Sequence, residues 1–371
     1  MSSNERIRIT YEFALAEGES PEAGARRIAL EQTVELPDGC YPDRIEEAVV
    51  ARVEELEALA ENRCRAALSF APALVGNEVP QLLNVLFGMV SLLPATRVVE
   101  FELPDGLLRR YGGPRFGIEG IRAACTKAVG RPLLCTSAKP VGLSAAELAT
   151  ICGALARGGI DVVKDDHSVA DQATAPFAER VGRCSEAVQR ANEATGGSTL
   201  YFPNVTSPVT ELFDRVATAK AAGCRGVLVS PFATGLDTLR WLAENSGLIV
   251  LVHPTFSGAL YHADHGVSLP VLGRLLRVLG SDGVTYVNAG GRFPVTEREC
   301  HAVNDSLRGP LGSLRPALPV PGGGMDVDRA AYWTERYGVD TMFLIGSSLY
   351  AQGDLEVASR RLVDAVTGAA G

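Results

Sequence analysis

The chain has 371 residues, a net charge of −9 at pH 7 and a hydrophobic content of 46%. This length and apolar content suffice for one large core and a second, smaller unit. The acidic balance argues against a nucleic-acid surface, because phosphate backbones require clustered Lys and Arg. A small anionic substrate needs only a local cationic pocket, so a phosphorylated small molecule remains compatible with the composition.

The eight cysteines are spaced singly, without a CxxC pair. Several lie inside apolar runs, which is typical of buried, reduced thiols in a cytosolic protein. The N-terminus is polar and charged, and no run approaches the roughly 20 apolar residues that span a bilayer. We therefore expect a cytoplasmic protein that binds neither a membrane nor nucleic acid.

The first 113 residues predict a small α+β domain of the ferredoxin-like kind. The helix start at Ser20-Pro21 combines a typical N-cap with proline in the first turn. Gly112-Gly113-Pro114 marks the boundary, so we expect domains at 1–113 and 114–371. The predicted elements are a strand at 7–16, a helix from Ser20 to about Leu30, two strands within 47–74, a helix at 79–92 and a strand at 96–103.

From about residue 130 the pattern becomes regular, with apolar strands that each precede a stretch of helical periodicity. Eight such units in roughly 240 residues predict a closed (β/α)8 TIM barrel. The alternative is an open, doubly wound sheet, which eight evenly spaced repeats disfavour. The predicted strands lie at 132–138, 160–164, 199–204, 226–231, 248–253, 284–288, 317–320 and 341–345.

The second predicted strand runs into Lys164, Asp165, Asp166 and His167. Because side chains alternate along a strand, Lys164 and Asp166 share one face and Asp165 faces away, where we expect a structural salt bridge or a cap. Catalytic groups of such barrels lie at the carboxyl ends of the strands. Lys164, Asp166 and His167 are therefore candidate metal or acid–base residues. The alternative is a solvated turn with helix-capping aspartates.

Polar or glycine-rich residues also follow most of the other predicted strands. Two glycine-rich tips on adjacent strands favour phosphate binding by backbone N–H groups, with Arg292 as a charge-assisted contact. The alternative for either tip is a flexible turn. The residues at these ends are Lys139, Asn204, His253, Asn288, Arg292, Gly322-Gly323-Gly324 and Gly346-Ser347-Ser348.

The segment Lys139-Pro140-Val141-Gly142-Leu143-Ser144, followed by Gly158-Gly159 and Lys164-Asp165-Asp166, resembles the signature region of the ribulose bisphosphate carboxylase (RuBisCO) large chain and of its non-carboxylating relatives, the RuBisCO-like proteins (form IV). The resemblance implies that Lys139 moves a proton during enolisation. It implies that Lys164 is carbamylated, and that the carbamate, Asp166 and the residue at His167 bind Mg2+. The cation would stabilise the enolate of a phosphorylated keto compound.

The same resemblance implies a homodimer, in which Glu31 of one chain reaches the site of its partner. It places His253, at the end of the fifth strand, among the catalytic residues. Asn204, Asn288, Arg292 and the two glycine-rich tips would then contact the phosphorylated substrate.

Several departures from the family pattern bear on the reaction. The tip after the sixth strand carries Arg292 but no lysine to hold carbon dioxide, Pro254 replaces an arginine for the second phosphate, and Gly322 replaces a serine. We therefore do not expect carbon dioxide fixation. His167 stands where the family has glutamate, and its imidazole suits Zn2+ or Mn2+ better than Mg2+.

The leading hypothesis is a RuBisCO-like lyase or isomerase that forms a metal-stabilised enolate, with an inclination towards decarboxylation or isomerisation of a 3-oxo sugar-acid phosphate. One alternative is an enolase or isomerase of a methylthio-ketose phosphate, of the methionine-salvage type. Others are a catalytically silent sugar-phosphate-binding barrel and an aldolase with a Schiff base at Lys164. A zinc cluster of His253, His262 and His265 is a further, less favoured hypothesis.

Overall fold

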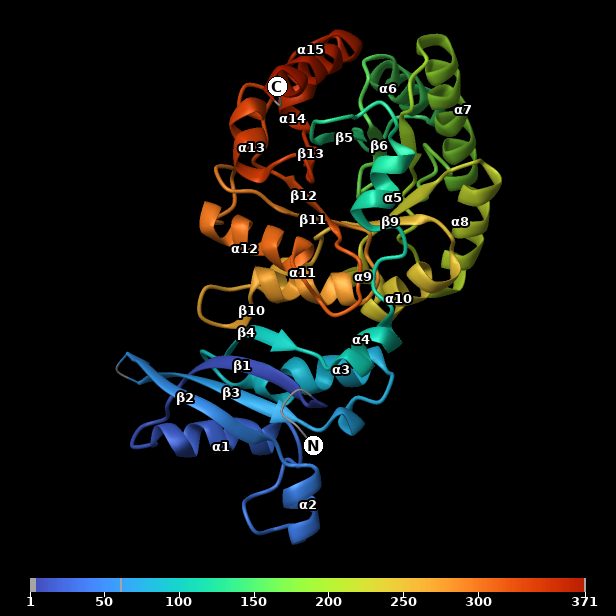
Figure 1. The fold of residues 1–371 in the computed structure, drawn as a ribbon. Helices are drawn as coiled ribbons and strands as arrows, with labels where there is room; N and C mark the ends of the chain where they lie inside the picture. The colour runs from blue at the N-terminus through green and yellow to red at the C-terminus, as the bar shows by residue number, and fades with distance from the viewer. Residues whose placement is uncertain (1–4, 61, 370–371) are drawn as a thin grey trace. The chain divides into compact units, whose positions relative to one another are not determined.

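The computed structural model describes residues 5–60 and 62–369 (Figure 1). The chain forms two compact units, and neither is continuous in sequence. The first comprises Met1–Gly112, Ser257–Leu275 and Leu311–Leu314, and the second comprises Gly113–Phe256, Leu276–Pro310 and Arg315–Gly371. The predicted boundary at residue 113 places Ser257–Leu275 and Leu311–Leu314 in the barrel domain, whereas the structure places them in the first unit. A local sequence pattern does not indicate contacts with residues that are distant in sequence.

The first unit is built on a five-stranded sheet in the order β10-β4-β1-β3-β2. β1 pairs antiparallel with both β3 and β4, and residues along it alternate between buried and half-buried. Ser20 caps α1 as predicted, accepting a hydrogen bond from the backbone N–H of Ala23. Its elements are β1 (Ile7–Ala14), α1 (Pro21–Glu31), α2 (Asp43–Ala48), β2 (Arg52–Ala60), β3 (Arg63–Phe70), α3 (Val79–Phe87), β4 (Arg97–Glu102), α4 (Asp105–Tyr111) and β10 (Gly266–Val267).

The predicted α+β architecture of the N-terminal region is confirmed, with differences in detail. The helix expected at 79–92 ends at Phe87, and a short 3-10 helix, Met89–Leu92, follows. β10 was not predicted, because a two-residue strand carries no periodicity. It pairs parallel with β4, through Gly266 and Val267.

The second unit contains an eight-stranded parallel sheet in the order β7-β6-β5-β13-β12-β11-β9-β8. The two outer strands are joined through Leu228, which donates to the carbonyl of Pro203 at 2.9 Å and accepts from the N–H of Val205 at 2.9 Å. The barrel is therefore closed, and the open-sheet alternative is wrong. Its strands are β5 (Leu133–Ala138), β6 (Val162–Asp165), β7 (Leu200–Phe202), β8 (Gly226–Val229), β9 (Ile249–Val252), β11 (Gly283–Val287), β12 (Leu318–Gly322) and β13 (Met342–Leu344).

An apolar plug fills the amino end of this barrel. Ile118 and Ile121 of α5 (Gly117–Ala124) join a buried cluster with the first residues of several strands, Leu133 among them. The Asp282 carboxylate fixes the chain there by accepting the N–H groups of Phe116 at 2.7 Å and Gly117 at 2.8 Å. With this end packed, the opposite end of the strands is where polar groups can converge on a ligand.

Helices surround the barrel strands, as Figure 1 shows. Within the part of the chain that the structure describes, no helix is both long and apolar enough to cross a membrane. All eight cysteines are free and only Cys40 is exposed, in line with the expected reduced thiols. The helices are α6 (Ala145–Arg157), α7 (Phe177–Thr195), α8 (Val209–Ala221), α9 (Pro231–Thr234), α10 (Leu236–Asn245), α11 (Leu269–Val278), α12 (Glu297–Arg308), α13 (Ala330–Tyr337), α14 (Ser347–Tyr350) and α15 (Leu355–Ala369).

Candidate active site at the carboxyl ends of the barrel strands

Lys164 lies inside the barrel near the end of β6. It pairs in register with Ser137 of the neighbouring strand β5, and its Nζ donates to Ser137 Oγ at 2.9 Å. The residue is 1% exposed. Burial lowers the pKa of this amine, and the charge of Lys139 adds to the effect. The chain therefore holds Lys164 towards its neutral form, which is the form that adds carbon dioxide.

Asp165 faces the opposite way, as the alternation predicted. Its carboxylate accepts from Arg180 Nε at 3.1 Å and from the Tyr201 hydroxyl at 2.7 Å, and Asp165 and Arg180 are both fully buried. The expected structural salt bridge is confirmed. It anchors the end of β6 to α7 and β7, which fixes the direction in which Lys164 and Asp166 point.

Asp166 connects two other predicted residues. One carboxylate oxygen lies 3.5 Å from Lys139 Nζ, and the other lies 3.2 Å from His167 Nδ1 and accepts the N–H of Ser168 at 3.2 Å. Burial alone would raise the pKa of this carboxyl. The contact with His167 and the charge of Lys164 outweigh that effect and hold the pKa below its usual value. Asp166 is thus held as an anion.

Lys139 extends from the end of β5 towards the end of β13. A Cβ atom added to Gly346 would lie 3.2 Å from Lys139 Nζ, so the absence of a side chain at Gly346 leaves room for the amine. The hydroxyl of Tyr350 accepts from the backbone N–H of Lys139 at 3.3 Å and donates to the backbone carbonyl of Ser137 at 2.8 Å. Tyr350 therefore positions the tip of β5. Sequence reasoning missed it because a lone tyrosine in a late helix carries no local signal.

His253 follows β9, and its ring stacks on that of His167, with centroids 4.2 Å apart and planes 8° apart. The backbone N–H of Thr255 donates to His253 Nδ1 at 3.2 Å, and Thr255 Oγ1 lies 2.6 Å from the same nitrogen. Burial, with the charges of Lys164 and His167, lowers the pKa of His253 to about 2. The ring is therefore neutral and presents Nε2–H.

A divalent cation requires more donors than the unmodified side chains supply. Within residues 5–60 and 62–369, no three His, Cys, Asp or Glu side chains are arranged to hold a metal ion. Of the three histidines in the alternative zinc cluster, His262 and His265 belong to the first unit and His253 to the second. Asp166 and His167 do lie together, and a carbamate on Lys164 would add a third, oxygen-bearing ligand. This donor set fits a cation that keeps several waters, as Mg2+ does.

The glycine-rich tips of β11 and β12 lie against each other. A Cβ on Gly291 would come within 2.0 Å of the Gly323 carbonyl oxygen, and one on Gly324 within 2.8 Å of the Gly291 nitrogen. Only bare backbone fits at this junction. After β13, Ser347 is exposed, whereas the Ser348 hydroxyl accepts the N–H of Val327 at 3.0 Å. Gly322, at the end of β12, is buried.

Two residues predicted to contact the substrate, Asn204 and Asn288, form hydrogen bonds within the protein instead. Asn204 is fully buried, and its amide donates to the carbonyls of His167 and Val169, both at 3.1 Å. Asn288 is also buried, and its side-chain oxygen accepts from the Tyr337 hydroxyl at 2.8 Å. In this conformation Asn204 holds the loop that carries His167, and Asn288 secures the end of β11.

The remaining predicted residues are Arg292 and Glu31. Arg292 is exposed, with its guanidinium carbon 5.0 Å from the centre of the Phe293 ring. Glu31 is half-buried at the last position of α1, in the first unit. Its neighbour Gln32 is structural, because its amide donates to the carbonyl of Val85 at 2.7 Å.

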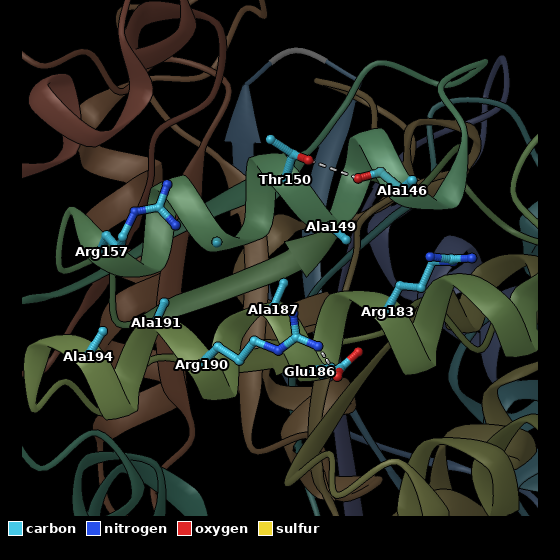
Figure 2. Close-up of a pocket in the computed structure, with 11 residues that line it drawn as sticks. Ala146, Ala149, Thr150, Arg157, Arg183, Glu186, Ala187, Arg190, Ala191 and Ala194 are labelled. Carbon is cyan, nitrogen blue, oxygen red and sulfur yellow. Dashed lines mark hydrogen bonds and ion pairs between the residues drawn. The ribbon is translucent and has the colours of Figure 1, made fainter.

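A separate hollow of about 500 Å³ lies between α6 and α7, and its floor is mainly alanine (Figure 2). None of its lining residues belongs to a strand or to a strand tip. Each arginine at its rim is ion-paired, Arg157 with Glu356, Arg183 with Glu179 and Arg190 with Glu186. The hollow therefore offers no uncompensated charge and is not part of the candidate active site.

Comparisons with known proteins identify relatives over nearly the whole chain. Residues 117–353 match the family model described as ribulose bisphosphate carboxylase large chain, catalytic domain. The 5-methylthioribulose-1-phosphate isomerase of Rhodospirillum rubrum is 38% identical over 370 residues, which cover 99% of this chain and 97% of that protein.

Solved structures extend the likeness to the whole chain. The Rubisco-like protein from Rhodopseudomonas palustris superposes with a TM-score of 0.89 at 37% identity, covering 98% of both chains. The octameric ribulose-1,5-bisphosphate carboxylase/oxygenase of Pyrococcus horikoshii superposes with a TM-score of 0.90 at 27% identity, covering 99% of this chain and 88% of that one. The chain therefore belongs to the ribulose bisphosphate carboxylase large-chain family, and within it to the RuBisCO-like proteins.

Proposed function

We propose that this protein isomerises a phosphorylated methylthio-ketose by enolisation next to its carbonyl, and does not fix carbon dioxide. The observation that carries the proposal is the placement of Asp166 between Lys139 at 3.5 Å and His167 at 3.2 Å, beside the buried amine of Lys164. Two lysines, a carboxylate and an imidazole thus meet at one end of the barrel. The substrate class is that named for the R. rubrum relative.

In this proposal Lys139 removes the proton from the hydroxyl-bearing carbon next to the carbonyl and returns it to the former carbonyl carbon. The hydroxyl proton passes to the former carbonyl oxygen, so the carbonyl moves by one carbon. Asp166 orients the ammonium through its ion pair, and the bare backbone at Gly346 leaves room for the amine to move. Neutral His253 offers Nε2–H as a donor to an oxygen on which negative charge develops. The reaction is redox-neutral, because the proton removed from one carbon is returned to another.

Mg2+ is the proposed cofactor, with Mn2+ or Zn2+ as alternatives because His167 offers a nitrogen ligand. A carbamate on Lys164, Asp166 and His167 would hold the cation. When bound, it supplies Lewis-acid stabilisation of the enolate oxygen. The Asp166–His167 contact also suits an arrangement in which Asp166 orients the ring and His167 binds through Nε2.

The ends of β9 and β11 favour a methylthio substrate over a 3-oxo sugar-acid phosphate. Pro254 follows His253 at the end of β9. Phe256, after β9, and Phe293, after the neighbouring strand β11, are 70% and 41% exposed. Exposed aromatic rings suit an apolar thioether tail better than a carboxylate or a second phosphate.

The test is proton exchange into 5-methylthioribulose 1-phosphate, followed by proton NMR in D2O with Mg2+ and bicarbonate present. We expect solvent deuterium beside the carbonyl and an isomeric ketose phosphate as product. Both should be lost in Lys164→Met and kept in Lys127→Met, a change at an exposed lysine. An unchanged substrate, with carbon dioxide released instead from a 3-oxo sugar-acid phosphate, would favour the decarboxylase. Absence of both exchange and product with the wild type would favour a binding protein, and borohydride trapping at Lys164 would favour the aldolase.

We also propose that the chain works as a homo-oligomer, since the P. horikoshii carboxylase is octameric. In a dimer of the family type, Glu31 of one chain would reach the site of the partner. Mixing inactive Lys164→Met chains with inactive Glu31→Gln chains should then restore part of the activity. The absence of any restoration, with mixed dimers demonstrated by mass spectrometry, would contradict a shared site.

A further inference from the structure

An arginine outside the predicted set lies at the junction of the β11 and β12 tips. Arg329 comes five residues after Gly324 and is half-buried. Its Nη1 would lie 2.7 Å from a Cβ atom added to Gly290, the residue two positions after Asn288. Gly290 has a φ of +79°, so a side chain would be disfavoured there by backbone conformation as well. The guanidinium therefore occupies the space that the missing side chain of Gly290 leaves.

Two aromatic rings of α13 orient this guanidinium. Its central carbon lies 4.8 Å from the ring centre of Tyr332 and 4.6 Å from that of Trp333. Stacking of this kind uses the face of the guanidinium and leaves its N–H donors at the edge available. Within the described ranges 5–60 and 62–369, no carboxylate forms an ion pair with the Arg329 guanidinium. The Asp326 carboxylate accepts the backbone N–H of Arg329 at 2.7 Å.

A neighbouring arginine shows the contrasting arrangement. Arg336 stacks on the same Tyr332 ring at 4.3 Å, but its Nη1 pairs with Glu297 at 3.3 Å. The charge of Arg336 is thus compensated inside the protein, whereas that of Arg329 is not. An oriented arginine without an internal anion, beside bare glycine backbone, is an arrangement suited to bind an external anion.

We propose that Arg329 binds the phosphate of the substrate through its guanidinium edge, together with backbone N–H groups of the Gly323-Gly324 tip. This deepens the proposed function and rests on it. The planar edge matches two phosphate oxygens, which a lysine cannot reproduce. Because Pro254 stands where the family has its phosphate-binding arginine, Arg329 supplies a guanidinium from a different strand end, for one phosphate rather than two.

The test measures binding of inorganic phosphate to the full chain by 31P NMR titration, with Mg2+ and bicarbonate present. We expect Arg329→Gln to weaken phosphate binding by about 10- to 100-fold, the range expected for a lost charge-assisted, two-point contact. Arg329→Lys should fall between the wild type and Arg329→Gln. Arg336→Gln, which removes a guanidinium from the same aromatic ring, should change phosphate affinity less than twofold.

A second variant changes Gly290, the residue against which the Arg329 guanidinium lies. Gly290→Ala places a methyl group where Nη1 now lies and should weaken phosphate binding while Arg329 itself is unchanged. Thermal melting would show that each variant is folded. In the isomerase assay, Arg329→Gln should raise KM more than it lowers kcat, because the phosphate is remote from the reacting carbons.

Equal affinities in wild type, Arg329→Gln and Gly290→Ala, or equal losses in Arg329→Gln and Arg336→Gln, would overturn the proposal. So would a wild-type protein that binds no phosphate. These outcomes are distinct from failure of the proposed function, which would appear as absence of isomerisation by a wild type that still binds phosphate through Arg329.

Discussion

The imidazole rings of His167 and His253 lie face to face, with centroids 4.2 Å apart and planes 8° apart. Two rings in this arrangement cannot both carry a positive charge without repulsion. Burial, with the charges of Lys164 and His167, lowers the pKa of His253. His167 is thus held between a carboxylate, Asp166, and a neutral ring. This environment favours a role as a fixed ligand or orienting group for His167 over free movement.

Restoring the family's carboxylate at this position should change the metal preference. We expect His167→Glu to strengthen Mg2+ binding relative to Mn2+, because a hard anionic oxygen replaces a nitrogen ligand. Calorimetric titration with each metal in the presence of bicarbonate would measure the two affinities. His262→Glu, at an exposed loop histidine, adds the same charge without the same neighbours. An unchanged Mg2+ to Mn2+ ratio in His167→Glu would exclude His167 as a ligand.

The buried pair of Asp165 and Arg180 should be important for stability. Asp165→Asn leaves the fully buried Arg180 guanidinium without its anion, and breaking such a pair by removing one partner costs about 3–5 kcal/mol. Urea unfolding would measure the difference in free energy. Glu179→Gln, which breaks an exposed pair with Arg183 on the same helix, should cost less than about 1 kcal/mol. Similar costs for the two variants would argue that the buried contact is not the anchor described.

The ion pair of Glu19 and Arg27 should give a pH-dependent contribution to stability. The hydrogen bond from Arg27 lowers the pKa of Glu19 below its usual value of 4.5. A lowered acid pKa stabilises the folded state above the usual pKa, and that stabilisation is lost as the pH falls through the folded-state value. We expect Glu19→Gln to cost about 1 kcal/mol at neutral pH and progressively less below about pH 4.5. A difference independent of pH would contradict this linkage.

Glycines should differ sharply in their tolerance of a methyl group. Gly324→Ala places Cβ 2.8 Å from the carbonyl oxygen of Asn288, which is backbone and cannot yield easily. We expect it to raise KM or reduce kcat at least tenfold, the order of effect of a displaced positioning element. Gly182→Ala lies in an exposed part of α7 with no atom near the added Cβ, and it should raise stability by about 0.5–1 kcal/mol. Steady-state kinetics and thermal melting would distinguish the two.

Much of the barrel was predictable, because its signals are local. An apolar run of a few residues followed by helical periodicity predicts one β/α unit whatever its partners, and all eight predicted strands are present. The opposite orientations of Asp165 and Asp166 follow from strand alternation alone. The capping of α6 by Ser144 and Glu147, within the segment that carries the family resemblance, is equally local.

What the sequence by itself determined is therefore the list of strands, the residues that end them and the faces on which alternate side chains lie. Only the tertiary structure decided that the amides of Asn204 and Asn288 are used internally, that His167 stacks on His253 and that Arg329 reaches Gly290. The physical reason is that backbone propensity and periodicity act between near neighbours in the chain. Hydrogen bonds, ring contacts and compensation of charge depend on which distant segments the closed barrel brings together.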